Sequence, residues 1–182
     1  MEFSCNNLIR EVERKAKHDL LPLERAMEGV ETLAAASLLT RRVNFRIEDD
    51  RDISAASAVI IRDVLPAPWP SDQQKAILDR ALFDGASYGM LRFHHRRHAE
   101  YLAAKCLLRL LSNNCPYTDI EEVLFAEVDG FWTIRPSLEP VAAWLAGVAE
   151  MPSIERLRQR VLEAAPDIHL RYGDPGVLPL PY

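Results

Sequence analysis

The sequence predicts a mainly α protein, in which helices and one β-hairpin precede a set of stacked helical pairs. Apolar residues recur at helical spacing along most of the 182 residues. Gly85 and Gly89 flank the segment Ala-Ser-Tyr, and because glycine readily adopts positive φ, this pattern is typical of a tight reversal. Proline, asparagine and glycine interrupt the helical pattern at 65–70, 113–116 and 129–130.

In the first half of the chain, residues 7–18 show one apolar face, and Pro22 suits the first turn of a helix that continues to about Leu39. Residues 41–47 alternate apolar and charged side chains, which predicts a short edge strand. Ser54 could cap a helix that ends near Val64. The proline-rich connector 65–70 must be non-helical. A capping box at 71–74 predicts the next helix, which should end at 82 or 83.

In the second half, a long helix is expected from Arg96 to Ser112, where two asparagines and a proline stop it. A second capping box at 118–121 predicts a helix that continues to about Val128. A short strand and two helices complete the pattern, at 131–135, 137–149 and 153–164. The domain boundary is expected near 114, which divides the chain into 1–114 and 115–182.

Composition and charge limit the class of protein. Hydrophobic residues make up 48% of the chain and charged residues 27%, which is typical of a folded globular protein. A net charge of −5 gives no global reason to expect nucleic acid or an anionic membrane as the partner. The chain shows no secretory signal and no apolar run long enough to span a bilayer, so we expect a cytoplasmic protein. Cys5, Cys106 and Cys115 are expected to be reduced.

The familiar signatures of catalytic sites are missing from the sequence. No GxxxxGK[ST] phosphate loop and no GxSxG elbow occur, and no serine or cysteine has an identifiable base partner. We therefore expect no catalytic residue in this chain and do not expect it to be an enzyme.

The densest polar segment is RFHHRRHAEY at 92–101, which holds three of the five histidines. On a helix, His94 and His98 would share one face at the spacing of paired zinc ligands. A hydrolytic zinc site also needs a glutamate beside the first histidine, but His95 occupies that position. A small metal-dependent hydrolase therefore stays open as an alternative, although we assign no metal ligand.

Basic residues in and after this segment raise a second alternative, a winged-helix DNA-binding protein. Phosphate contacts depend on cations, and a hairpin beside a helix is a common DNA-binding shape. The cations are Arg92, Arg96, Arg97, Lys105 and Arg109. However, the apolar run at 101–104 and residues 107–108 predict that much of this helix is buried. We therefore do not expect nucleic acid as the partner, and a helical scaffold without a ligand remains the simplest alternative.

Residues 83–104 resemble the winged-helix segment of NACHT-type STAND NTPases, whose pattern is roughly Phe-x-His-x-x-Phe-Gln-Glu-Tyr-Leu-Ala-Ala. His98 and Ala99 depart from the pattern, where the family has an aromatic residue and glutamine. Residues 134–146 and 170–179 also resemble helical regions that follow this domain in bacterial antiviral STAND proteins. The matching residues are Phe93, His95, Glu100, Tyr101, Leu102, Ala103 and Ala104.

This resemblance implies a winged-helix-like unit with a regulatory role. In such proteins the winged-helix histidine contacts the β-phosphate of bound ADP and stabilises the inactive state, and exchange for ATP opens the molecule. His95 is the aligned residue, and His94 is the alternative if the register shifts by one. The family's phosphate loop and magnesium-binding aspartate lie upstream and have no counterpart in this sequence. The chain alone should therefore hold no ADP or ATP. Its expected partner is the NTPase core of the same polypeptide or complex. Its C-terminal helical region is expected to contact a protein target.

Overall fold

A computed structural model describes Cys5 and residues 21–47, 58–66, 69–147 and 152–172. The chain forms two compact units, Met1–Ala103 and Ala104–Tyr182. The boundary between them along the chain falls within the helix α5 (Arg96–Ser112). The expected boundary lay just after this helix. The prediction of a mainly α protein is confirmed. The helix expected at 7–18 lies outside the described residues.

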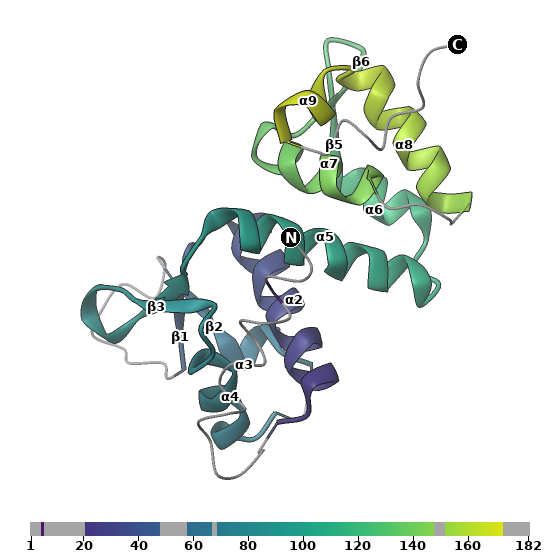
Figure 1. Ribbon diagram of the computed structural model, residues 1–182. Helices are drawn as coiled ribbons and strands as arrows, with labels where there is room; N and C mark the ends of the chain where they lie inside the picture. The colour runs from purple at the N-terminus through teal and green to yellow at the C-terminus, as the bar shows by residue number, and fades with distance from the viewer. Residues whose placement is uncertain (1–4, 6–20, 48–57, 67–68, 148–151, 173–182) are drawn as a thin grey trace. The chain divides into compact units, whose positions relative to one another are not determined.

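In its described residues, the first unit contains the helices α2 (Leu23–Thr40), α3 (Ile61–Val64) and α4 (Ser71–Leu78), together with the start of α5 (Figure 1). The helix expected from Pro22 is confirmed as α2. Close packing explains the glycine in its middle, because a Cβ on Gly29 would lie 2.4 Å from Cδ1 of Ile77 and 2.8 Å from Cη2 of Trp69. Such distances are well inside van der Waals contact, so glycine allows α4 to approach α2 closely.

The first unit also contains a four-stranded sheet with the order β2-β1-β4-β3. β1 (Asn44–Arg46) pairs parallel with β2 (Ala58–Ile60) and antiparallel with β4 (Leu91–Phe93), which in turn pairs antiparallel with β3 (Phe83–Gly85). The strand expected at 41–47 is confirmed, but its place at an edge is wrong because β2 covers its other side. Residues 58–60 form this strand and not the expected helix, since a short apolar run suits either structure.

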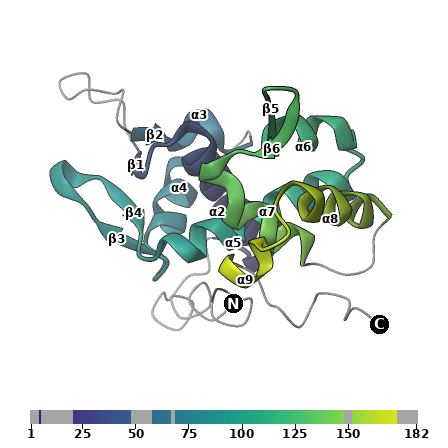
Figure 2. The same ribbon diagram turned by 90° about the horizontal axis from the view of Figure 1, so that it is seen from above.

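β3 and β4 form the predicted hairpin, which extends away from the helices of its unit in both views (Figures 1 and 2). Its base is held by three mutually contacting aromatic rings, Phe45 of β1, Phe83 of β3 and Phe93 of β4. Their ring centroids lie 4.7–5.7 Å apart, within the range of favourable aromatic pairs. All three rings are buried, so this aromatic cluster fixes the hairpin against β1.

Neither predicted capping box forms. Pro70 and Pro116 occupy the N-cap positions of α4 and α6 (Tyr117–Leu124), and neither helix has a side-chain capping bond. Each proline has an extended backbone, so the helix begins immediately after it and places the serine or threonine inside the first turn. Gln74 instead donates its amide Nε2–H to the carbonyl oxygen of Trp69. Helix α4 ends at Leu78, earlier than expected.

The second unit contains another hairpin, which the sequence prediction missed. Residues 125–128, expected to end a helix, form β5 (Phe125–Val128), which pairs antiparallel with β6 (Phe131–Ile134). The strand expected at 131–135 is confirmed as β6. Asp129 and Gly130 both have positive φ, 52° and 80°, as a two-residue hairpin turn requires. An Asp-Gly pair between apolar residues is itself a hairpin signal, which outweighed the helical pattern here.

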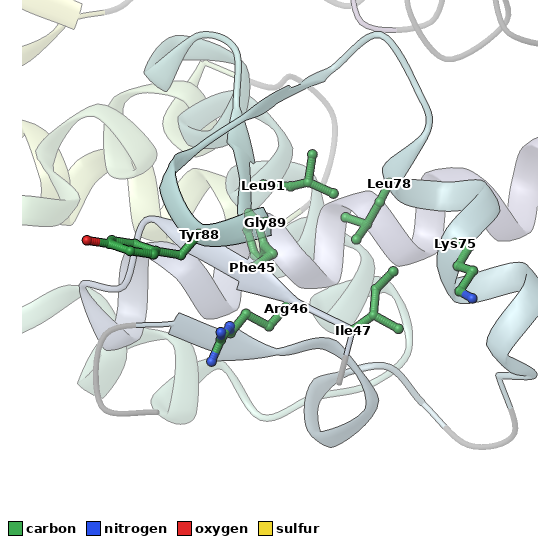
Figure 3. Close-up of a pocket in the computed structure, with 8 residues that line it drawn as sticks. All are labelled: Phe45, Arg46, Ile47, Lys75, Leu78, Tyr88, Gly89 and Leu91. Carbon is green, nitrogen blue, oxygen red and sulfur yellow. The ribbon is translucent and has the colours of Figure 1, made fainter. Parts of the chain in front are cut away.

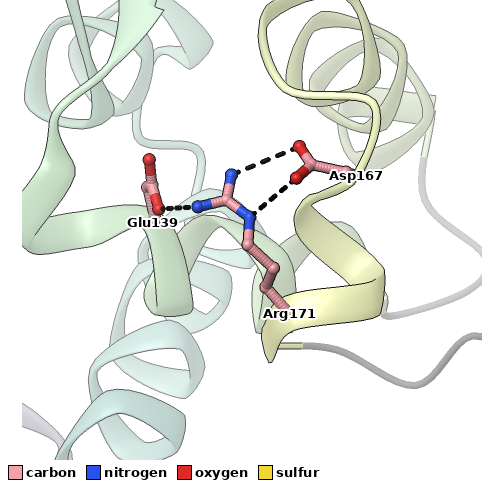
Figure 4. Close-up of polar contacts among 3 residues, drawn as sticks. All are labelled: Glu139, Asp167 and Arg171. Carbon is pink, nitrogen blue, oxygen red and sulfur yellow. Dashed lines mark hydrogen bonds and ion pairs between the residues drawn. The ribbon is translucent and has the colours of Figure 1, made fainter.

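Three further helices complete the second unit: α7 (Glu139–Ala146), α8 (Pro152–Ala164) and α9 (Ile168–Tyr172). Helices were expected at 137–149 and 153–164, as α7 and α8 confirm, whereas α9 was not expected. α7 packs against both α8 and α9. Arg171 of α9 links that helix to α7, because its guanidinium bonds Glu139 of α7 at 2.9 Å and also both oxygens of Asp167 (Figure 4).

Candidate functional site

The candidate site is a histidine cluster at the junction between the β3–β4 hairpin and α5. We define the histidine cluster as Asp84, His94, His95 and His98. Asp84 belongs to β3, His94 follows β4, His95 directly precedes α5, and His98 lies in the first turn of α5. The structure therefore brings together the three histidines that the sequence singled out and adds a carboxylate from the opposite strand.

Hairpin register explains the contact between Asp84 and His94. Asp84 is paired with Arg92, and the backbone N–H of His94 donates to Leu82, which continues the ladder by one more pair. His94 is thus the diagonal neighbour of Asp84 on one face of the hairpin. Its Nδ1 lies 2.5 Å from Oδ2 of Asp84, where a protonated Nδ1 donates to the carboxylate. This bond fixes the orientation of the imidazole.

The other two rings continue from His94 in a chain of edge contacts. The His94 and His95 centroids lie 4.3 Å apart, and those of His95 and His98 lie 5.5 Å apart. His95 is exposed, whereas only 8% of His98 is accessible and its Nδ1 has no hydrogen-bond partner. Burial, followed by the nearby His95 and His94, lowers the pKa of His98 below its ordinary value of 6.5. His98 is therefore neutral at pH 7.

The start of α5 offers a favourable place for an anion. The first N–H groups of a helix have no partner within the helix, and the helix dipole adds partial positive charge there. No acidic residue lies in the first turn of α5, and Arg96 and Arg97 are both exposed. Nε of Arg96 bonds the buried Glu100 at 2.8 Å, one turn along the helix. Of the parts of the histidine cluster, this end of α5 has the chemistry that favours a phosphate or carboxylate group.

The geometry does not reproduce the paired zinc ligands considered for His94 and His98. Helix α5 begins at Arg96, so His94 lies before the helix and not one turn from His98 on the same helical face. Within the described part of the chain, no group of three or more histidine, cysteine, aspartate or glutamate residues is placed to hold a metal ion. The three cysteines are free thiols.

The DNA-binding alternative stays a prediction, although the structure limits which elements could carry it. In a helix-turn-helix the second helix enters the major groove. Because α4 follows α3 in the chain, α4 would be that second helix. Its charged residues, Asp72 and Lys75, cancel each other. The hairpin turn at 85–90 contains no lysine or arginine. The apolar side of α5 is buried as expected, at Leu102 and Leu107.

The sequence analysis missed Asp84, the carboxylate of the histidine cluster. The hairpin was predicted, and a register that paired residues 83 and 93 would have placed Asp84 diagonally opposite His94. Register depends on the length and type of the turn, however, and these could not be identified because Tyr88 adopts positive φ together with Gly89. Tyrosine is not a residue that predicts this conformation.

The chain matches no protein-family model, no curated protein and no solved structure. The resemblance to the winged-helix segment of STAND NTPases therefore remains a prediction from the sequence. None of the described helices has both the length and the apolar character needed to cross a bilayer.

Proposed function

We propose that this chain is the regulatory module of a STAND-type NTPase, of the kind found in bacterial antiviral defence. In this proposal His95 contacts a phosphate of ADP that is held by an NTPase core outside this sequence. The contact stabilises the off state, and the C-terminal helical region connects that state to a protein target. One observation carries the proposal: His95 is an exposed imidazole at the N-terminus of a 17-residue helix without an acidic residue in its first turn.

The chemistry of this position suits a phosphate oxygen. An imidazole N–H that donates to phosphate makes a charge-assisted hydrogen bond, and helix N-termini favour anions. The neighbouring His94 is held by Asp84, and its ring packs against His95. His95 is thereby supported from one side while it stays accessible to a ligand. For this reason His95 is a better candidate than His94, whose Nδ1 already has a partner.

The contact could act as a switch only if it exists in one state of the intact protein. A ligand shifts a conformational equilibrium by no more than its difference in affinity for the two states. One charge-assisted hydrogen bond of about 1.5–3 kcal/mol, made only in the ADP-bound state, would change the equilibrium by roughly tenfold to a hundredfold. That is enough to regulate a nucleotide-dependent switch without any catalytic residue in this chain.

Calorimetry on the chain alone tests where the nucleotide is held. ADP and ATP should show no tight binding, because the phosphate loop is not encoded in this sequence. Submicromolar affinity for either nucleotide would contradict the proposal that the main phosphate contacts are supplied elsewhere.

A titration with inorganic pyrophosphate, followed by NMR, tests the site itself. We expect weak, saturable shifts of the amide signals of residues 95–97, which should become much smaller in His95→Ala. His94→Ala removes the imidazole that supports His95 but keeps His95 and the helix end, so it should reduce the shifts less than His95→Ala. If His95→Ala leaves the shifts unchanged, His95 is not the phosphate contact. In a polypeptide that joins this chain to an NTPase core, His95→Ala should also speed the release of ADP.

A further inference from the structure

A pocket of about 290 Å³ in the first unit lies between β1, α4 and the turn of the β3–β4 hairpin. Figure 3 shows Ile47 and Leu78 between Tyr88 at one end and Lys75 at the other. Nothing in the described part of the chain indicates what covers this pocket. The buried His169 of the second unit differs in this respect, because its surroundings define what it responds to.

His169 is buried with no hydrogen-bond partner for its imidazole among the described residues. Only 1% of the residue is accessible, and both Nδ1 and Nε2 are enclosed and unpaired. A neutral imidazole has one N–H donor and one acceptor nitrogen, so burying both unpaired is already unfavourable. An imidazolium ion would bury two unpaired donors together with a full charge, which is far more unfavourable. The site therefore accepts a neutral ring and excludes a charged one.

A neighbouring positive charge makes this preference stronger. Burial, followed by the charge of Arg158 in α8, lowers the pKa of His169 below its ordinary value of 6.5. Arg158 is held in place, because its Nε donates to the carbonyl oxygen of Ala146 at 2.8 Å and its Nη1 is paired with Glu155. A proton on His169 would therefore face a fixed like charge.

Helix α9 depends on this buried side chain for its position. A helix of five residues is not stable by itself, so α9 persists only through its packing on α7. It buries Ile168 and His169, and its other residues are exposed. The ion pair of Arg171 with Glu139 of α7 is a second attachment, which is partly exposed to water and therefore weak. Arg171 also bonds Asp167, so both of these carboxylates are already engaged.

We propose that the attachment of α9 to α7 is sensitive to pH: α9 stays attached while His169 is neutral and detaches when His169 takes up a proton. Detachment transfers the imidazolium ion to water and separates it from Arg158. It also uncovers the part of α7 that α9 covers, in a helix whose residues are almost all buried. Acidification would thus expose an apolar surface in the second unit, independently of the histidine cluster and of the nucleotide switch proposed above.

The direction of the effect follows from the two states of His169. Its pKa is lowered while α9 is attached and returns to about 6.5 when α9 is detached. The attached state therefore keeps its full stability above pH 6.5 and loses stability as the pH falls below this value. Because one proton is taken up, the ratio of detached to attached α9 should increase roughly five- to tenfold between pH 7.5 and pH 5.5.

Native-state amide exchange, corrected for the intrinsic pH dependence of exchange, tests this proposal. The N–H groups of Leu170 and Arg171 bond the carbonyl oxygen of Asp167 in the attached helix, so they report its opening. Their opening should increase roughly five- to tenfold from pH 7.5 to pH 5.5, while amides in the middle of α8 change much less. His169→Leu should abolish this increase.

Two control variants separate the proposed cause from others. Arg171→Met removes the ion pair and should increase opening at both pH values without changing their ratio. His98→Leu removes the buried histidine of the first unit and should leave the response of α9 unchanged. Should His169→Leu fail to fold, the imidazole ¹⁵N signals of the unmodified chain decide the question, because His169 must become protonated over the same pH range in which α9 opens.

The proposal is overturned by any of four results. The first is that α9 opens no more at pH 5.5 than at pH 7.5. The second is that α8 opens to the same extent, which would indicate unfolding of the whole second unit. The third is that His169→Leu keeps the pH response, and the fourth is that the His169 ring stays neutral while α9 opens.

Discussion

The two hairpins turn on similar backbone conformations but differ in loop length and surroundings. Three residues, 87–89, separate the paired positions 86 and 90 in the first, whereas two residues separate Val128 from Phe131 in the second. Each reverses on two residues with positive φ, Tyr88 and Gly89 in the first and Asp129 and Gly130 in the second. The first belongs to a four-stranded sheet, and its phenylalanines pack into the aromatic cluster with Phe45. The second is a separate two-stranded sheet, which buries Phe125 at its base but leaves apolar side chains exposed near its tip.

This difference shows that the surroundings of a hairpin, more than its turn, decide what its side chains can do. Because β1 and the aromatic cluster fix the first hairpin, it can hold Asp84 against His94 at the start of α5. No further strand covers the second hairpin in the described residues, and Phe131 remains exposed. The four predictions below test this contrast.

The largest effect is expected from removing one aromatic ring of each hairpin. Phe93→Ala should destabilise the first unit by about 3–4 kcal/mol, because it leaves a cavity among packed rings. Phe131→Ala should change stability by less than about 0.5 kcal/mol, since its ring is exposed. Urea unfolding of both variants measures the difference. Similar losses would mean that the hairpins are supported to the same degree.

The turn of the second hairpin should be sensitive to a β-carbon. Gly130→Ala should cost about 1–2 kcal/mol, because alanine is disfavoured at a φ of 80°. Gly85→Ala is the matched control in the first hairpin. Gly85 does not have positive φ, and a Cβ there would meet no neighbour within 4 Å. Thermal unfolding should therefore show a lower midpoint for Gly130→Ala alone.

The turn of the first hairpin should instead become more stable when Tyr88 is replaced. Tyr88→Asn should raise the free energy of unfolding by about 1 kcal/mol, since asparagine tolerates positive φ better than tyrosine. If denaturant unfolding shows Tyr88→Asn to be less stable, the tyrosine ring supports the fold and this prediction is wrong.

The smallest effect concerns pH and His98, the buried histidine in the first turn of α5. Because the pKa of His98 is lowered in the folded state, the unfolded chain takes up a proton first as the pH falls below about 6.5. Stability should therefore decrease from pH 6.5 downwards and stay unaffected by this group above it. His98→Leu should weaken the pH dependence without removing it, because the pKa of the buried His169 in the second unit is also lowered. Unfolding curves between pH 5 and pH 8 measure this, and an unchanged slope in His98→Leu would contradict it.

The sequence by itself determined the elements whose signals are local. Apolar periodicity was enough to predict α2 and α5, since a helix bonds within its own segment. Two glycines between apolar positions predicted the first hairpin and placed the histidines at its junction with α5. The same local reading misplaced residues 58–60 and 125–128, because their short apolar runs suit a helix as well as a strand.

Only the tertiary structure decided which strands pair and which side chains meet. β2 became a strand through its pairing with β1, and Asp84 reached His94 through the register of the hairpin. Likewise, the pocket beside Tyr88 exists only where β1, α4 and a hairpin turn come together. These contacts join residues far apart in the chain, and their free energy depends on the whole packed unit, which no local pattern encodes.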